Sequence, residues 1–399
     1  MISLNFTRLR DYMDRLVQEY NVPGVDCIVY KEHEQIFRYF TGKSDIESNK
    51  YLRGDDLYLI FSMTKMLTCT CALQLFEQGK FLMSDPISKY LPEFERMRIS
   101  NAEHDNSKAT LITTGADTGK YDEVSDDGYA KNPITFRDLF TMSAGLDYNL
   151  GADYIKKALA EGKKTTRELV GAFSETVLGF EPGTRFRYSL CHDVLGALIE
   201  VISGKKFGDY MTENLLEPLG MKDTFFGLPK DEERLSRMAA LYSYNAERRP
   251  ERKPLNCCFN LSDEYQSGGA GLVSCTEDYA LFLDALANGG VGKTGNRILS
   301  SSTVELMRTN HLTGKPYEDF QNLRQGYGYG LGVRTHVDKI KSGSLSPVGE
   351  FGWDGAAGAF SMVDPSNKLS LTYFQQIHGW DLRIQTEMRN ILYSCLTFL

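Results

Sequence analysis

The first eighty residues change between helical and strand-like spacing of their apolar positions. Apolar residues recur every three or four positions over 5–20, which predicts an amphipathic helix that ends at Asn21–Gly24. Apolar positions alternate over 25–29, and an apolar-rich run covers 36–40, so these two runs predict a β-hairpin. A largely apolar helix is expected over about 62–78.

The middle of the chain has helical spacing, and its end is strand-like again. Helical patterns dominate from 135 to about 225. Residues 101–131 are polar and are expected to form an exposed insertion, in which 110–113 has the composition of a strand. Two apolar runs, 359–363 and 369–374, flank a turn with Pro and Asn, and predict an antiparallel hairpin before a C-terminal helix.

These patterns predict one α/β domain and one helical domain. Both ends of the chain are mixed α/β and the middle is helical. The simplest architecture is an α/β domain made of 1–75 and 263–399, with a helical domain of 76–262 inserted between its two halves.

Composition narrows the possible functions. The chain has 399 residues, of which 25% are charged and 42% apolar, the mix of an ordinary globular protein. Its formal charge of −8 disfavours binding to nucleic acid. Six scattered His and eight Cys without a Cys-x-x-Cys pair predict neither a metal site nor a cofactor, and the cysteines are expected to be reduced. We see no signal peptide or membrane span, and expect a cytoplasmic protein without a membrane partner.

Ser62 and Lys65 form a Ser-x-x-Lys motif in a setting that suits nucleophilic catalysis. Lys65 is the only charged residue between Asp56 and Glu77, on an otherwise largely apolar helix. Ser62 lies at the expected start of that helix, where backbone N–H groups favour a developing anion. Positions i and i+3 share a helix face, so the amine can reach the hydroxyl. Burial disfavours the charged ammonium form of Lys65, which suits a general base. The alternative interpretation is that the methylene groups of Lys65 are buried while its ammonium group is solvated.

The chain resembles the serine β-lactamase and penicillin-binding protein superfamily, in the class C-like branch that includes family VIII carboxylesterases. The resemblance covers nearly the whole chain, and several matching stretches follow the family order. It implies an antiparallel sheet flanked by helices, an inserted helical domain, and an active site between the two. Beyond the Ser-x-x-Lys motif, the matching stretches are 134–146, 182–189, 218–224, 267–274 and 329–332.

The second family motif, Tyr-x-Asn, falls on residues 188–190. The resemblance implies that Tyr188 relays a proton between Ser62, Lys65 and the leaving group. A phenol ordinarily ionises near pH ~10, so a neighbouring cation would have to favour its anion, and Lys65 is the candidate. The alternative is a core tyrosine before a helix. Leu190 replaces the family's Asn, and so removes the amide that would hold the side chain of a β-lactam.

The third family motif, Lys-Thr-Gly, is best matched by Trp353, Asp354 and Gly355, in the Trp-x-Gly form of family VIII esterases. Trp353 would replace a carboxylate-binding cation with a flat apolar wall. Asp354 stands where the family has a small residue, which makes carboxylate substrates less favourable still. The alternative interpretation is that Asp354 is simply an aspartate in a surface turn. The resemblance places the oxyanion hole at the backbone N–H groups of Ser62 and Ala356.

Two further sets of residues imitate these motifs in unsuitable settings. Ser203–Lys206 repeats Ser-x-x-Lys, but its helix is expected to end at Gly204 with solvated lysines. Ser243–Asn245 with Lys293–Gly295 imitates the class A pair, but the first lies before a solvated loop and the second is not on an expected strand.

The leading hypothesis is a serine hydrolase that forms a covalent acyl-enzyme, most simply an esterase on small, neutral acyl esters. A β-lactamase or a D-amino-acid or DD-peptidase of the same fold is the alternative. The alternative from a different functional class is a homologue that binds a ligand without catalysis. The expected partner is a small-molecule ester or amide. Oligomeric state and the choice between hydrolysis and acyl transfer stay open.

Overall fold

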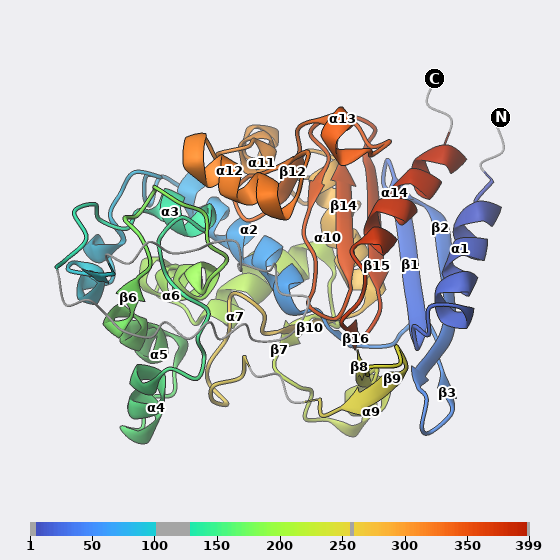
Figure 1. The fold of residues 1–399 in the computed structure, drawn as a ribbon, viewed down its shortest axis with the longest axis horizontal. Helices are drawn as coiled ribbons and strands as arrows, with labels where there is room; N and C mark the ends of the chain where they lie inside the picture. Colours follow the sequence, from blue (N-terminus) through green and yellow to red (C-terminus); the bar gives the residue numbers. More distant parts are fainter. Residues whose placement is uncertain (1–4, 101–127, 256–258, 397–399) are drawn as a thin grey trace.

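The computed structural model describes residues 5–100, 128–255 and 259–396, and Figure 1 shows a sheet-containing part beside a helical part. Among these residues, the largest sheet has eight strands, and its neighbouring strands run antiparallel. The expected mixed α/β class with an antiparallel sheet is therefore confirmed. In sheet order the strands are β11 (Tyr327–Tyr329), β12 (Arg334–His336), β13 (Phe351–Gly352), β14 (Phe360–Asp364), β15 (Leu369–Phe374), β1 (Gly24–Lys31), β2 (Glu34–Asp45) and β3 (Lys50–Tyr51).

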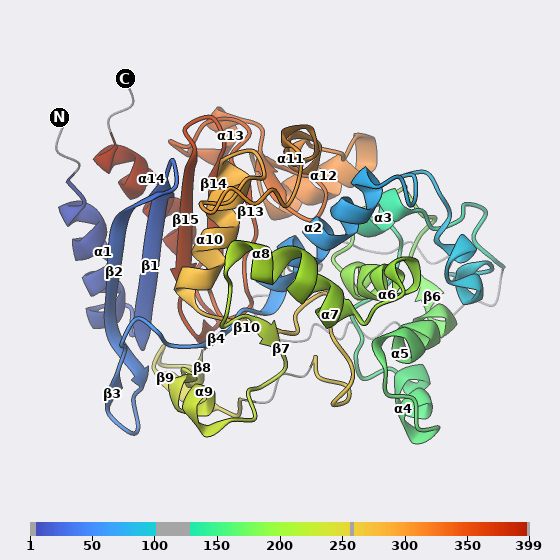
Figure 2. The ribbon, with the colours of Figure 1, turned by 180° about the vertical axis from the view of Figure 1, so that it is seen from behind.

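Both expected hairpins lie in this sheet, β1 with β2 and β14 with β15, and β1 pairs with β15 to join the two ends of the chain. Since β1 and β15 are buried along almost their whole length, helices cover both faces of the sheet. On one face, α1 (Thr7–Gln18) packs with α14 (Arg383–Cys395). On the other, α10 (Thr276–Ala287) lies against β1, β14 and β15 (Figure 2).

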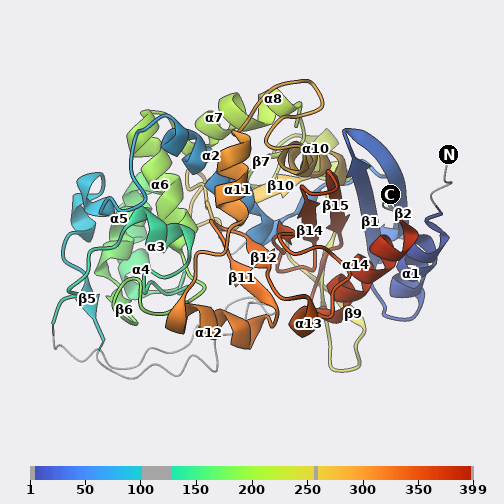
Figure 3. The ribbon, with the colours of Figure 1, turned by 90° about the horizontal axis from the view of Figure 1, so that it is seen from above.

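Helix α2 (Thr64–Glu77) lies between the two parts and packs against α6 (Cys191–Ser203) of the helical part (Figure 3). Every residue of α2 from Thr64 to Leu75 is buried, which explains why this stretch of sequence has no polar face. The other α-helices are α3 (Phe136–Phe140), α4 (Asp153–Ala160), α5 (Thr166–Ala172), α7 (Phe207–Met211), α8 (Glu217–Leu219), α9 (Glu232–Arg237), α11 (Ser301–Arg308), α12 (Gly314–Leu323) and α13 (Lys339–Ser342). The 3₁₀ turns are η1 (Phe61–Met63), η2 (Ile87–Lys89), η3 (Pro92–Phe94) and η5 (Phe173–Glu175), and η6 (Thr212–Leu216) is a π-helical turn.

Small sheets connect the expected helical segment 76–262 to the rest of the chain, because β7 and β8 pair with strands outside it. The expected division at residues 75 and 262 stays a prediction. Residues 101–127, including the expected strand at 110–113, lie outside the described residues. Within the described ranges, no helix is both long and apolar enough to cross a membrane. The small sheets are β4 (Tyr58–Leu59), β10 (Leu272–Ser274) and β7 (Phe225–Phe226); β16 (Ile377–His378), β8 (Leu241–Tyr244) and β9 (Pro250–Lys253); and β5 (Arg98–Ile99) with β6 (Val177–Leu178).

Candidate active site

Ser62 lies in the tight turn η1, which joins strand β4 to helix α2. Phe61 has a φ of 45°, a left-handed conformation that is uncommon for a bulky residue. Its buried ring lies edge-on to the rings of Phe259 and His378. Ser62 is partly exposed, whereas Phe61 and Met63 on either side of it are buried. The turn therefore presents the Ser62 hydroxyl at the start of a buried helix.

Lys65 is fully buried and its amine has three oxygen neighbours. Its Nζ donates to the carbonyl oxygen of Gly269 at 2.7 Å and to the phenol oxygen of Tyr148 at 3.2 Å. The hydroxyl oxygen of Ser62 lies 3.4 Å from the same nitrogen. The structure thus brings the two residues of the Ser-x-x-Lys motif within reach of a proton transfer.

Two tyrosines face Lys65, although the sequence predicted only Tyr188. Nζ of Lys65 lies 4.6 Å from the ring centre of Tyr188 and 5.3 Å from that of Tyr148. The two phenol rings are stacked, with their centres 5.6 Å apart. The oxygen of Tyr188 accepts a hydrogen bond from Nε1 of Trp353 at 3.3 Å. Tyr148 was missed; the available signal was its place two residues after the matching stretch 134–146.

Gly355 brings the segment that carries Ala356 close to the turn around Ser62. A Cβ atom at Gly355 would lie 2.7 Å from the carbonyl oxygen of Ile60, so a side chain there would push the two segments apart. Within the described ranges, the backbone N–H groups of Ser62 and Ala356 donate no hydrogen bond. Two unused donors on neighbouring segments are what an oxyanion hole requires.

The carbonyl oxygen of Ala356 is held by two rings. It accepts from Nε1 of Trp380 at 3.0 Å and lies 3.2 Å from Nδ1 of His378. Burial lowers the pKa of His378, so its imidazole is neutral at pH 7 and its Nδ1–H can donate to this carbonyl. These contacts restrict the orientation of the Ala356 backbone.

Trp353 and Leu190 are both about 2% exposed and form part of the core. The Trp353 ring stacks on Tyr188 at 5.7 Å and meets Tyr329 edge-on at 5.1 Å. Leu190 precedes α6, and its backbone N–H donates to the carbonyl oxygen of Asp147 at 3.0 Å. Since almost none of its own surface is exposed, Trp353 contacts the surroundings of Lys65 through Tyr188.

Asp354, which the sequence suggested as a residue that discourages carboxylate substrates, has its charge balanced inside the protein. Its Oδ2 forms a buried ion pair with the guanidinium of Arg324, and both side chains are 8% exposed. The other end of the Arg324 guanidinium lies 3.4 Å from Oε1 of Gln385. Repulsion of a substrate carboxylate by Asp354 is therefore not supported, because the neighbouring Arg324 cancels its charge.

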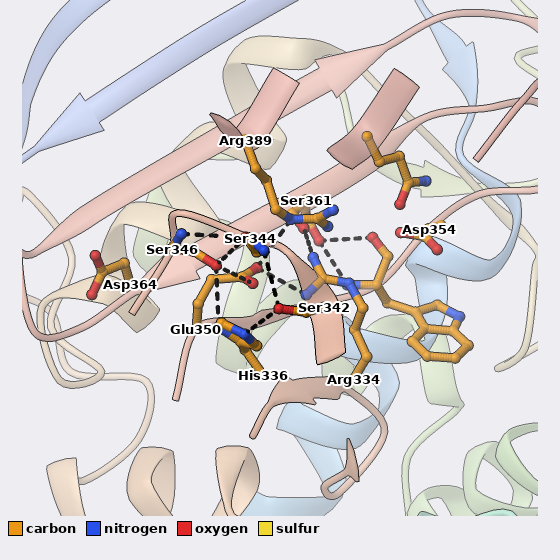
Figure 4. A network of polar contacts seen from close by, with 12 residues as sticks. Arg334, His336, Ser342, Ser344, Ser346, Glu350, Asp354, Ser361, Asp364 and Arg389 are labelled. Atoms are coloured by element: carbon orange, nitrogen blue, oxygen red, sulfur yellow. Dashed lines mark hydrogen bonds and ion pairs between the residues drawn. The ribbon is translucent and has the colours of Figure 1, made fainter. Parts of the chain in front are cut away.

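A buried polar network of Ser361 in β14, Arg334 in β12, Glu350 and Arg389 in α14 (Figure 4) bonds the backbone of Trp353 through Ser361. The hydroxyl of Ser361 accepts from the Trp353 N–H at 3.0 Å and donates to the Trp353 carbonyl at 2.9 Å. Arg334 donates to the carbonyl of Ser361 at 2.9 Å and to Glu350 at 2.8 Å. Although burial opposes ionisation, Arg334 and Arg389 hold the pKa of Glu350 below its usual value. The network therefore keeps its charges at neutral pH.

The rejected motif copies lie in unsuitable settings. Ser203 is the last residue of α6, followed by Gly204 in a left-handed conformation, and Lys205 is ion-paired with Glu213. Lys293 lies in an exposed turn between α10 and α11, not on a strand. Neither setting offers the buried amine that Lys65 provides.

The family model described as Beta-lactamase matches residues 9–392. Protein Rv1367c of Mycobacterium tuberculosis is 29% identical over 379 residues, covering 90% of this chain and 87% of that protein. Esterase EstB of Burkholderia gladioli is 26% identical over 396 residues, covering 91% and 88%. The solved structure of EstCE1, described as a hydrolase with promiscuous acyltransferase activity, matches with a TM-score of 0.77 at 24% identity over 97% of both chains, which shows a shared fold.

Proposed function

Because the chain belongs to the beta-lactamase family, we propose that it is a serine hydrolase that forms a covalent acyl-enzyme on Ser62. The observation that carries the proposal is the buried amine of Lys65, which lies 3.4 Å from the Ser62 hydroxyl. A nucleophile next to a desolvated base at the start of a helix is the arrangement that acyl transfer needs.

The proposed reaction has two stages. In the first, Oγ of Ser62 attacks the ester carbonyl carbon, and its proton passes to Lys65. The N–H groups of Ser62 and Ala356 would stabilise the oxyanion, a contribution of about 3 kcal/mol for one donor. The C–O bond to the leaving group breaks, and Tyr188 hands a proton to the departing alcohol. In the second stage, water attacks the acyl carbonyl carbon and passes one proton to the Tyr188 phenolate. The C–O bond to Ser62 breaks, and Lys65 returns its proton to Ser62 as the carboxylic acid leaves.

Neutral acyl esters are the substrates that this site would favour. The side chains around Ser62 and Lys65 are aromatic: Tyr148 stacks on Tyr188 and meets Phe259 edge-on at 5.8 Å. Trp353 replaces the family's cation, and the nearby Arg324 is already paired with Asp354. A carboxylate on the substrate would therefore be desolvated without a charged partner, which is unfavourable. An apolar acyl group carries no charge, so the same contact has no such desolvation cost.

Covalent labelling and substrate comparison test the proposal together. A fluorophosphonate should add one label by intact mass, and peptide mapping should place it on Ser62. Ser62→Ala should abolish labelling while the fold is retained by circular dichroism. Ser203→Ala, in the second Ser-x-x-Lys motif, should label like the wild type and serves as the matched control. Protein that takes no label would be a non-catalytic homologue.

Short p-nitrophenyl esters compared with nitrocefin test the substrate class. We expect kcat/KM for p-nitrophenyl acetate or butyrate to exceed that for nitrocefin by several orders of magnitude. The reason is that two hydrogen-bonding partners for a β-lactam are replaced by Leu190 and Trp353, each worth roughly 1–3 kcal/mol. Higher kcat/KM for nitrocefin would favour the β-lactamase alternative and overturn the esterase assignment.

A further inference from the structure

Asp193 is a buried carboxylate near Lys65 that no sequence motif identified. It lies in the first turn of α6 and is 1% exposed. Its Oδ1 accepts from the phenol of Tyr265 at 2.8 Å and from the hydroxyl of Ser267 at 2.6 Å. Burial raises the pKa of Asp193, whereas Ser267, Lys65 and Tyr265 oppose that shift. A buried carboxyl group needs such hydrogen-bond partners, so its position beside the amine of Lys65 calls for a reason.

Asp193 is connected to Lys65 through the loop of residues 267–270. The Ser267 hydroxyl, which donates to Asp193, also accepts from the backbone N–H of Ala270 at 3.1 Å. On the other side of the loop, Thr68 of α2 donates to the carbonyl of Gly268 at 2.7 Å. The loop is thus held between α6 and α2. The next carbonyl in the loop, that of Gly269, accepts the 2.7 Å hydrogen bond from Lys65.

The same loop brings the charges of Asp193 and Lys65 close together. A Cβ atom at Gly269 would lie 2.5 Å from Oδ2 of Asp193, 3.2 Å from the phenol oxygen of Tyr148 and 3.3 Å from Nζ of Lys65. The three groups therefore face one small space, and the carboxylate and the amine lie within about 6 Å of each other, the range over which opposite charges stabilise one another. Only glycine leaves this space open.

From this geometry we infer that Asp193 is a positioning residue for Lys65. It acts in two ways: through Ser267 it holds the Gly269 carbonyl on the amine, and its negative charge favours the ammonium form that Lys65 takes after accepting a proton. The inference rests on the proposed function in one respect, namely that Lys65 is the base for Ser62.

The other titratable groups around this pair do not change charge near neutral pH. Burial raises the pKa of the thiols of Cys69 and Cys191 and of the Tyr265 phenol well above neutrality, so all three stay protonated. Burial, assisted by Lys65, lowers the pKa of His192 to about 3, so its imidazole is neutral. Tyr148 and Tyr188 are the remaining neighbours, and both are present unchanged in every variant below.

The charge is tested by the pH dependence of Asp193→Asn. The amide keeps an oxygen that can accept from Ser267 and Tyr265, but removes the negative charge. Because the ammonium of Lys65 becomes less stable, the acid limb of the profile of kcat/KM against pH should move lower by about one pH unit. Asp278→Asn is the matched control: Asp278 is a buried carboxylate in the first turn of α10 that accepts from Thr224 at 2.9 Å, away from Lys65. It should leave the limb in place.

The loop is tested separately by Ser267→Ala. This variant leaves the Asp193 carboxyl group in place and removes the Ser267 hydroxyl that bonds it, so kcat should fall about tenfold while the acid limb stays in place. If Asp193→Asn leaves the acid limb where it is in the wild type, while wild type is labelled on Ser62, the inference is wrong and the proposed function stands. If wild type takes no fluorophosphonate label, the proposed function itself fails. Thermal melting of each variant checks that the fold is kept.

Discussion

At the scale of single residues, Tyr148 and Tyr188 present the same chemical group to Lys65 in different ways. The Tyr148 oxygen accepts from the amine at 3.2 Å. The Tyr188 oxygen instead accepts from the Trp353 indole, and its ring lies beneath the amine. Because the Tyr148 oxygen is bonded to Lys65 and the Tyr188 oxygen is not, we assign the orientation of Lys65 to Tyr148 and the proton relay to Tyr188.

Replacing each tyrosine with phenylalanine tests this division of roles. Tyr188→Phe removes the proton carrier and should lower kcat for p-nitrophenyl butyrate by about 10²-fold or more. Tyr148→Phe removes one hydrogen bond to Lys65, worth about 1 kcal/mol, and should lower kcat roughly tenfold or less. Both variants keep the stacked rings, so their stability should be close to that of the wild type. A larger loss for Tyr148→Phe would reverse the two assignments.

How far the sequence predicts these residues depends on what each of them contacts. Ser62 and Lys65 were found because they are three residues apart on one helix, so their relation is local. Tyr148, Asp193 and Arg324 were not found. Tyr148 reaches Lys65 across 83 residues, and Arg324 reaches Asp354 across 30, so only the folded chain reveals their partners.

At the scale of elements, the segment from Trp353 to Ala356 is held on both sides by buried polar groups. Ser361 bonds both backbone groups of Trp353. Arg324, just after the end of α12, is ion-paired with Asp354, while burial lowers the pKa of its guanidinium. Because the next residues supply the proposed oxyanion donor, this ion pair links the end of α12 to the position of the Ala356 N–H.

Breaking the ion pair should be costly to stability. Asp354→Asn leaves the Arg324 guanidinium buried without a counter-charge, and should lower the free energy of unfolding by about 3–5 kcal/mol. The double variant Asp354→Asn with Arg324→Met removes the unpaired charge as well, so it should recover part of that loss. Urea unfolding of the wild type, Asp354→Asn, Arg324→Met and the double variant gives the coupling energy between the two side chains. If the losses in unfolding free energy of the two single variants add up to the loss of the double variant, the ion pair contributes no coupling energy.

The long elements were predictable because their patterns are local. The helices α1 and α14 and both hairpins lie where apolar spacing placed them. The two-residue strand β7 and the four-residue strand β8 are too short to show a period, and their pairing is decided by β10 and β16. The sequence pattern therefore predicted mainly helices in the inserted segment and did not predict β7 and β8.

At the scale of the whole molecule, α2 lies between the parts, and its buried surroundings make stability depend on pH. His192, at the start of α6, is fully buried. Its ring lies 3.6 Å from Sγ of Cys69 on α2 and 3.4 Å from the carbonyl of Phe140 in α3. Burial and the nearby Lys65 lower the pKa of His192 from 6.5 to about 3. Protonation of the imidazole is thus disfavoured where these helices pack.

This shift predicts a loss of stability in acid that one substitution should reduce. Between pH 6.5 and about 3 the unfolded chain binds a proton at His192 that the folded protein does not, so stability falls as the pH falls, by about 1.4 kcal/mol per pH unit. His192→Gln fills similar space without a titrating group. Carboxylates such as Glu350 also weaken the fold in acid, but they do so equally in both proteins. Between pH 7 and pH 5, the free energy of unfolding from urea titrations should therefore fall by roughly 2 kcal/mol more in the wild type than in His192→Gln. Equal losses in the two proteins would show that His192 is protonated in the folded state, and that the helices around α2 accommodate its charge.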